Sequence, residues 1–276
     1  MLQRYLAKTF WVSATGVALL AGSASVSVAG DLIAHRAIYD LVLKHASDNS
    51  GIDDMYGRMV YEFTGSACKG YNVKFRFMTA VDMGGERRLT DQQTLTFEDL
   101  KAGKFKFETK SFSNNQLNQD VQGEAKTGPA GIMVNLMGDQ TRKVELAKSA
   151  FPTEQMIDVI DRAQKGEHFF ETRVFDGSDT GDKSLYTTTV VGNAVTPKGV
   201  DGDSAKAGML ADKSYWPVTV AYFDDKTGKD QLPTYRVAFK LYDNGVTRDL
   251  TMDYGDFVLT GKLSSIDFLK EEGSCS

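Results

Sequence analysis

The chain has 276 residues and a formal net charge of -5 at pH 7, from 37 acidic and 32 basic side chains. An acidic surface repels phosphate backbones and anionic lipid headgroups, so nucleic-acid binding is not expected. Five prolines and 26 glycines, with 41% hydrophobic residues, indicate a folded chain with many turns.

The first 29 residues have the pattern of a Sec signal peptide. Arg4 and Lys8 form a basic start, residues 10–21 are apolar, and residues 27–29 are small enough for signal peptidase. The apolar stretch is shorter than the roughly 20 residues of a spanning helix, and no cysteine follows it closely, so no membrane or lipid anchor is expected. We therefore predict a soluble, exported protein.

Removal of this segment would lower the net charge from -5 to -7, because it takes away two basic residues and no acidic one. The remaining residues, 30–276, are many for one domain but within the range of a sandwich or barrel. We predict that they form a single domain.

Most of the mature chain alternates apolar and polar residues, as half-buried strands do. Within residues 31–44, Tyr39, Leu41 and Leu43 alternate, and a strand fits at least as well as a helix. The next strand shows four apolar residues in alternation, at Tyr71, Val73, Phe75 and Phe77.

A hairpin is predicted around a turn at residues 99–103. By the same alternation, Leu95 and Phe97 supply the apolar side of the strand before this turn. Phe105 and Phe107 supply that of the strand after it.

One segment has the period of a helix instead. Apolar residues with i, i+3, i+4 spacing occur at Met156, Ile157, Val159 and Ile160. Pro152 suits the start and Gly166 the end. We predict an amphipathic helix over about 152–165, which either covers an open end of the sheet or acts as a lid over a ligand cavity.

The C-terminal part is again strand-like. Residues 218–223 form one strand, residues 224–229 a turn, and Tyr235 begins another strand. The sequence Asp243-Asn244-Gly245 then predicts a hairpin, because Asn-Gly tolerates the positive φ angles of a type I′ turn. Antiparallel strands, polar turns and one helix predict an all-β fold, either a sandwich or an incomplete barrel.

The two cysteines, Cys68 and Cys275, lie far apart in the sequence. In an oxidising compartment they are expected to pair with each other, although a free thiol or a bond to a partner protein is the alternative. An internal bond would hold the C-terminal end beside the first third of the chain.

Motifs of catalysis are missing from the sequence, including Gly-x-Ser-x-Gly, His-Glu-x-x-His, phosphate-binding and dinucleotide-binding loops. His35 and His45 lack a third ligand for zinc, and His168 is expected to pack at a strand start. We predict no catalytic residue, no cofactor and no metal site.

Three weaker signals have plain structural explanations. The acidic segment 176–182 resembles a calcium loop only loosely, and a solvated turn explains it better. Asp249 and Asp253 could serve a glycosidase, but a solvated strand face is the simpler interpretation. Trp216 could stack on a sugar or acyl chain, yet an aromatic residue beside proline is more often structural.

Four segments together resemble the EipB family of alphaproteobacterial envelope integrity proteins: Phe151-Pro-Thr-Glu-Gln, Val174-Phe-Asp-Gly-Ser-Asp-Thr-Gly-Asp-Lys, Tyr215-Trp-Pro-Val-Thr-Val-Ala-Tyr-Phe-Asp, and Tyr242-Asp-Asn-Gly-Val-Thr-Arg-Asp-Leu-Thr-Met-Asp-Tyr-Gly-Asp-Phe. They occur in order over the mature chain. The resemblance implies long antiparallel strands curled into a spiral or open barrel, with the helix closing one end, similar to the lipoprotein carrier LolA and its receptor LolB. It also implies a disulfide between Cys68 and Cys275.

The resemblance implies a non-enzymatic periplasmic protein, a monomer or weak dimer, that maintains the envelope under stress. Such a protein acts through a protein or peptide partner, or it carries a lipid or lipoprotein acyl chain inside the barrel. Residues expected to line such a cavity are the inward aromatics Tyr71, Phe75, Phe77, Phe105, Phe107, Phe239 and Phe257.

Overall fold

A computed structural model describes residues 32–138, 141–224 and 232–270 of the chain. The expected signal peptide, Cys275 and most of the turn at 224–229 lie outside these residues. Cys68 is disulfide-bonded; its pairing with Cys275 remains a prediction.

The described strands form a single antiparallel sheet of 14 strands. In chain order these are β1 (His35–Ala46), β2 (Asp54–Ser66), β3 (Gly70–Met83), β4 (Glu86–Asp99), β5 (Lys104–Ser113), β6 (Gln116–Thr127), β7 (Ile132–Leu136), β8 (Arg142–Leu146), β9 (Phe169–Val174), β10 (Leu185–Val191), β11 (Trp216–Asp224), β12 (Tyr235–Leu241), β13 (Thr247–Asp253) and β14 (Phe257–Phe268). Their order in space is β8-β7-β6-β5-β4-β3-β2-β1-β14-β13-β12-β11-β10-β9. The first strand therefore lies in the middle of the sheet. The chain runs outwards from β1 to one edge at β8, and then from the other edge at β9 inwards to β14, which pairs with β1.

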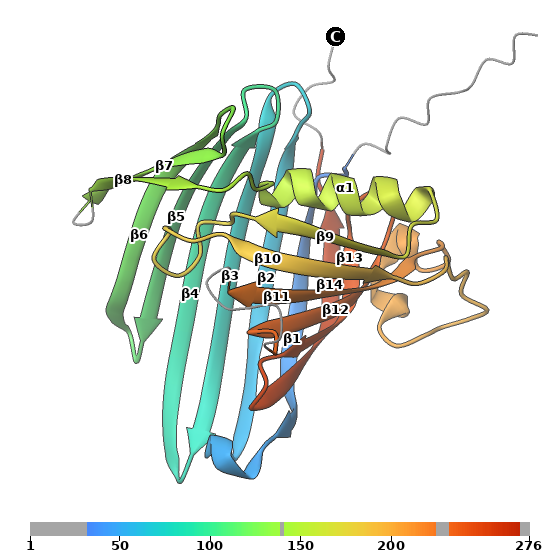
Figure 1. The fold of residues 1–276 in the computed structure, drawn as a ribbon. Helices are drawn as coiled ribbons and strands as arrows, with labels where there is room; N and C mark the ends of the chain where they lie inside the picture. The colour runs from blue at the N-terminus through green and yellow to red at the C-terminus, as the bar shows by residue number, and fades with distance from the viewer. Residues whose placement is uncertain (1–31, 139–140, 225–231, 271–276) are drawn as a thin grey trace, which may run out of the picture.

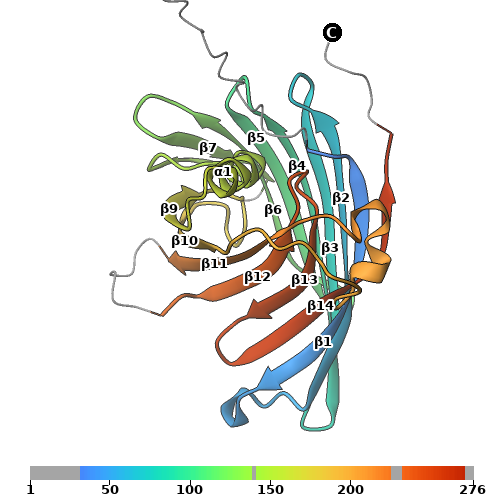
Figure 2. The same ribbon diagram turned by 90° about the vertical axis from the view of Figure 1, so that its right-hand side faces the viewer.

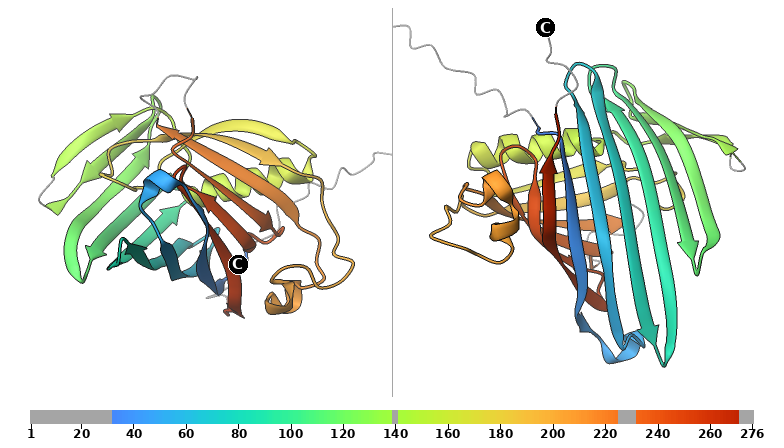
Figure 3. Two further views of the ribbon diagram at one scale, coloured as in Figure 1. Left: turned by 90° about the horizontal axis from the view of Figure 1, so that it is seen from below. Right: turned by 180° about the vertical axis from the view of Figure 1, so that it is seen from behind.

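The sheet curls around a central space, as the view from below in Figure 3 shows. Strands β1 to β6 run steeply in Figure 1, whereas β9 to β12 cross at a lower angle. The helix α1 (Pro152–Gln164) connects the two end strands β8 and β9 and crosses the top of the sheet (Figures 1 and 2). The predicted all-β architecture, an open barrel with one helix at one end, is confirmed.

Cross-strand register places apolar side chains on the inner face. Tyr39 of β1 is opposite Met59 of β2, which in turn is opposite Phe77 of β3. Tyr39 is fully buried, and its hydroxyl donates a hydrogen bond to the carbonyl oxygen of Thr247 on β13 (2.6 Å). This bond links two strands that both pair with β14, on the inner face of the sheet.

The faces of β4 are the reverse of the prediction. Leu95 is 50% exposed on the outer face, and Phe97 points outwards to pack over Gly70. The inner face carries Thr94 and Glu98 instead, since these residues are opposite Phe75 and Tyr71 of β3. The apolar alternation in β4 predicted the wrong inner face, because the residues of β4 that point inwards are polar and form hydrogen bonds inside the fold.

Helix α1 has the predicted bounds and buries Thr153, Val159, Ile160 and Ala163. It ends before Gly166, whose φ of 74° lies in the left-handed region that glycine tolerates. At the other end, the backbone N–H groups of Thr153 and Glu154 donate to the carboxylate of Glu98, at 2.7 and 2.9 Å. A buried carboxylate thus satisfies amides that the first turn of a helix leaves free.

The hairpin between β12 and β13 is present, but its turn is not type I′. Gly245 has a φ of 84°, whereas Asn244 keeps a negative φ, and type I′ needs positive values at both central residues. The Gly245 N–H donates to the carbonyl of Tyr242 at 3.1 Å. The turn therefore needs glycine at position 245, but it does not have the mirror-image geometry of a type I′ turn.

A β-bulge follows in β13, where Asp249 adopts a φ of 54°. Asp203, from the segment that crosses the outer face, accepts the backbone N–H groups of Asp249 and Leu263 at 3.1 and 2.6 Å. It also pairs with the fully buried Arg248 at 3.1 Å. This network satisfies the amides that the bulge leaves unpaired.

The carboxylates considered for a glycosidase serve as ion-pair partners. Asp249 pairs with Lys240 (2.9 Å) and Lys262, and Asp253 pairs with Arg236. Burial opposes the hydrogen bonds from Lys262 and Lys240, but these lower the pKa of Asp249, and the backbone N–H of Gly255 together with Arg236 lowers the pKa of Asp253.

Candidate ligand cavity

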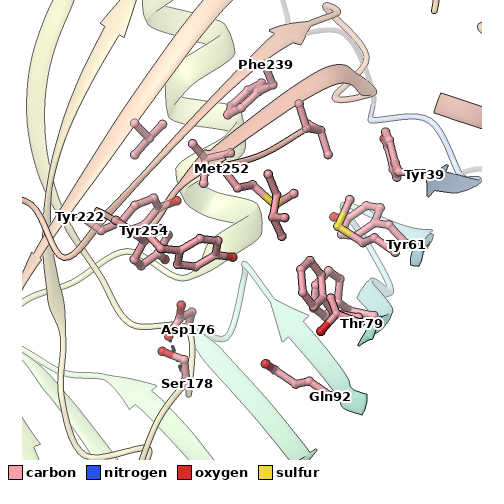
Figure 4. A pocket seen from close by; sticks show the side chains of 18 of the residues that line it. Tyr39, Tyr61, Thr79, Gln92, Asp176, Ser178, Tyr222, Phe239, Met252 and Tyr254 are labelled. Carbon is pink, nitrogen blue, oxygen red and sulfur yellow. Dashed lines mark hydrogen bonds between the residues drawn. The ribbon is translucent and has the colours of Figure 1, made fainter. Parts of the chain in front are cut away.

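A cavity of about 830 Å³ occupies the space enclosed by the curled sheet and helix α1 (Figure 4). Its wall is mostly apolar and includes Met55, Met59, Phe75, Phe77, Val81, Val220, Val237, Phe239, Leu250, Met252 and Phe257. Helix α1 contributes Met156 and Val159. The volume is that of a typical small-molecule site, which spans about 300–1,000 Å³.

The aromatics expected to line a cavity divide into two groups. Phe75, Phe77, Phe239 and Phe257 face the space. Tyr71, Phe105 and Phe107 do not; they are buried in packed clusters. Phe105 and Phe107 stack on each other and lie against Phe151 and Phe175, the residues that flank the helix and β9.

Tyr71 stacks on Phe63, with ring centroids 5.2 Å apart. Tyr71, Phe105 and Phe107 therefore belong to the packed core and not to the lining of the cavity. The reason is their place along the strands: they lie near the end closed by α1, where other side chains fill the interior.

Four aromatic rings stack in a row along the cavity wall. Tyr222 of β11 lies 4.3 Å from Tyr235 of β12, which lies 6.0 Å from Tyr254, which lies 4.9 Å from Phe257 of β14. We call this row the tyrosine ladder. Burial raises the pKa of all three tyrosine hydroxyls. They are therefore neutral at physiological pH.

The three hydroxyls of the ladder have no hydrogen-bond partner in the described parts of the chain. Asp176, in the segment after β9, lies close enough to Tyr222 and Tyr235 for its charge to raise their pKa further, after the larger effect of burial. Figure 4 shows Asp176 and Ser178 beside the tyrosines. The ladder and Asp176 thus form one polar patch on a mostly apolar wall.

Another unsatisfied polar group lies at the helix end of the cavity. The side-chain amide nitrogen of Gln155 is buried and has no hydrogen-bond partner among the described residues. Tyr61 also lines this end, and burial raises the pKa of its hydroxyl. A buried donor without a partner costs about 1–3 kcal/mol. A carbonyl oxygen of an occupant would remove that cost.

The histidines make no ligand set. His35 is buried, with Nδ1 2.8 Å from the carbonyl oxygen of Ile33, whereas His45 is exposed beyond a register shift in β1. His168 Nδ1 contacts the carbonyl oxygen of Val191 at 2.7 Å, directly before β9. Within the described ranges no group of three His, Cys, Asp or Glu side chains could hold a metal ion.

Ion pairs with residues outside the acidic segment 176–182 hold it in place. Asp182 pairs with Arg142 at 2.6 Å, and Asp179 with Lys183 at 3.2 Å. Trp216 begins β11 and packs against the cluster beneath α1. These residues do not line the cavity, in contrast to Asp176.

Sequence reasoning overlooked the methionines and tyrosines of the wall. Met55 and Met59 alternate with polar residues in β2, and that period could have identified them. Tyr222, Tyr235 and Tyr254 come from three separate strand ends, so only the folded sheet brings them together. Gln155 gave no signal, because a single polar residue in a helix is usually solvated. Asp176 was noticed only as part of the acidic segment 176–182, which was interpreted as a solvated turn.

A curled antiparallel sheet with an apolar cavity and a helix across one end defines a class of open-barrel proteins suited to enclosing a ligand. Among the described residues, no helix has the length and apolar character needed to cross a membrane.

The EipB-like family model matches residues 27–270, and the chain belongs to that family. The chain is 46% identical to the cell envelope integrity protein EipB of Brucella abortus (strain 2308) over 261 residues, which cover 93% of this chain and 92% of that protein. It is also similar to the crystal structure of a β-barrel-like protein of a domain of unknown function from Brucella abortus, with a TM-score of 0.83 and 45% identity. That match covers 87% of this chain and 99% of the other.

Proposed function

We propose that this protein maintains cell envelope integrity as a non-enzymatic periplasmic carrier that holds an acyl chain of a lipid or lipoprotein in its cavity. The observation that carries the proposal is the cavity itself. A barrel that served only as a scaffold would fill its interior, because protein cores pack without voids larger than a few waters. Here about 830 Å³ with an apolar wall is left unfilled.

The wall chemistry agrees with an acyl chain. Methionines are flexible and polarisable, and they adapt to chains of different shape. Met55 and Met59 of β2 and Met252 of β13 line the cavity from two different strands. The unsatisfied amide nitrogen of Gln155 at the helix end supports an occupant that brings an ester or amide carbonyl.

Binding of a fluorescently labelled palmitate to the protein tests the proposal. Val237 lines the cavity, and replacing it by tryptophan would place a large ring in the space. We expect Val237→Trp to bind the probe about tenfold or more weakly than the wild type, since overpacking costs roughly 1–3 kcal/mol.

Val190→Trp is the matched control, because Val190 is 51% exposed on β10 and does not line the cavity. It should bind the probe as the wild type does. A wild type without measurable binding, or equal binding by both variants, would contradict the carrier function.

A protein or peptide partner is the second candidate. Among the described strands, β8 pairs only with β7, and an open edge can accept an extended peptide as an additional strand. Native mass spectrometry of protein isolated from its own periplasm distinguishes the carrier function from the partner function. A bound lipid mass supports the carrier, whereas a bound unmodified peptide supports the partner function.

A further inference from the structure

Among the described residues that line the cavity, Asp176 is the one carboxylate. Its side chain accepts the backbone N–H of Ser178 at 2.9 Å. No ion-pair partner for it occurs among the described residues. A cation supplied by a ligand in the cavity could pair with this half-buried carboxylate.

The position of Asp176 is fixed on both sides. Phe175 is fully buried among Phe105, Phe107 and Phe151, and its backbone N–H donates to the carbonyl of Ala150 at 2.9 Å. Gly177 has a φ of 70° and packs so closely on Phe107 that a Cβ atom would lie 2.4 Å from that ring. The carboxylate is therefore held in place before any ligand arrives, as a preorganised site requires.

The tyrosine ladder adds oxygen atoms beside this carboxylate. Tyr222 and Tyr235 are neutral and near Asp176, and their hydroxyls have no partner in the described part of the molecule. A primary ammonium group has three N–H donors, which the carboxylate and hydroxyl oxygens together can accept. A quaternary ammonium group has none, and a glycerol head group has no positive charge.

We propose that Asp176 and the adjacent hydroxyls of Tyr222 and Tyr235 bind the primary ammonium group of an ethanolamine-type phospholipid whose acyl chain fills the apolar part of the cavity. This inference rests on the proposed carrier function. The lining also includes a cation, Arg88 of β4, which has no ion-pair partner among the described residues. Arg88 suits the phosphate that ethanolamine and glycerol phospholipids share, so it does not distinguish between them.

The test uses lysophospholipids with the same acyl chain and an ethanolamine, choline or glycerol head group, mixed with the mature protein and measured by native mass spectrometry. We expect the wild type to bind the ethanolamine lipid about tenfold more tightly than either of the others, since a charge-assisted hydrogen bond is roughly twice as strong as a neutral one. Asp176→Asn should reduce this preference to about twofold or less while still binding the glycerol lipid, which shows that its cavity is intact.

Asp179→Asn is the matched control. Asp179 belongs to the same segment but is exposed, pairs with Lys183 and does not line the cavity, so this variant should keep the full preference. Equal binding of all three lipids by the wild type, or a preference that persists in Asp176→Asn, would overturn the assignment of the ammonium site. Binding of none of them would instead overturn the carrier function.

Discussion

Replacing Glu98 by alanine removes the carboxylate that holds the start of helix α1. Glu98 is 2% exposed and accepts the backbone N–H groups of Thr153 and Glu154. The variant leaves two buried amides without an acceptor, and each lost hydrogen bond to a charged group costs roughly 1.5–3 kcal/mol. Some of this returns if water enters the space. We expect a loss of about 3 kcal/mol in the free energy of unfolding, which lowers the melting temperature by ~6–12 °C.

Urea denaturation followed by circular dichroism measures this loss. Glu62→Ala is the control, because Glu62 pairs with Lys74 on the outer face of the sheet, and a surface pair is worth less than about 1 kcal/mol. Equal midpoints for Glu98→Ala and Glu62→Ala would refute the role of Glu98 as the helix cap.

The pH dependence gives a second measurement on the same residue. Burial raises the pKa of Glu98, and the two amide donors oppose that shift only in part. Above its ordinary pKa of 4.5, the folded protein therefore keeps a proton that the unfolded chain has lost. The contribution of Glu98 to the free energy of unfolding must therefore fall as pH rises from its ordinary pKa to its raised pKa in the folded protein. Glu98→Gln, which cannot titrate, should lack this part of the slope.

Three further outcomes are expected. Serine at both Cys68 and Cys275 should lower the free energy of unfolding by up to about 5 kcal/mol in the chain-entropy model; unchanged urea midpoints would argue against a bond between them. Arg248→Met removes the buried guanidinium from its acidic partners and should cost ~3–5 kcal/mol, whereas Arg236→Met, at an exposed pair, should cost less than about 1 kcal/mol. Burial lowers the pKa of His35, so the unfolded chain takes up a proton first and stability should fall as pH drops below about 6.5; a His35→Phe variant that keeps the same slope would contradict this.

The cavity wall could be predicted only in part. Phe75, Phe77 and Phe239 belong to strands with clear alternation, and alternation identifies the inner face. It does not say whether an inward side chain meets another side chain or an open space. Phe105 and Phe107 have the same alternation, yet they pack against Phe151, which directly precedes helix α1, and Phe175, which follows β9.

The sequence by itself determined the strands, the hairpins and helix α1. Apolar periodicity, turn residues and helix caps act over a few neighbouring positions, so their effects can be read without the tertiary structure. The bounds of α1 and the hairpin at Gly245 follow from such short-range preferences. Only the tertiary structure decided that Glu98 faces inwards, that Leu95 faces solvent, and that Tyr222 and Tyr235 stack beside Asp176. These arrangements depend on the strand register and on how tightly the sheet curls, and both are set by contacts between residues far apart in the chain.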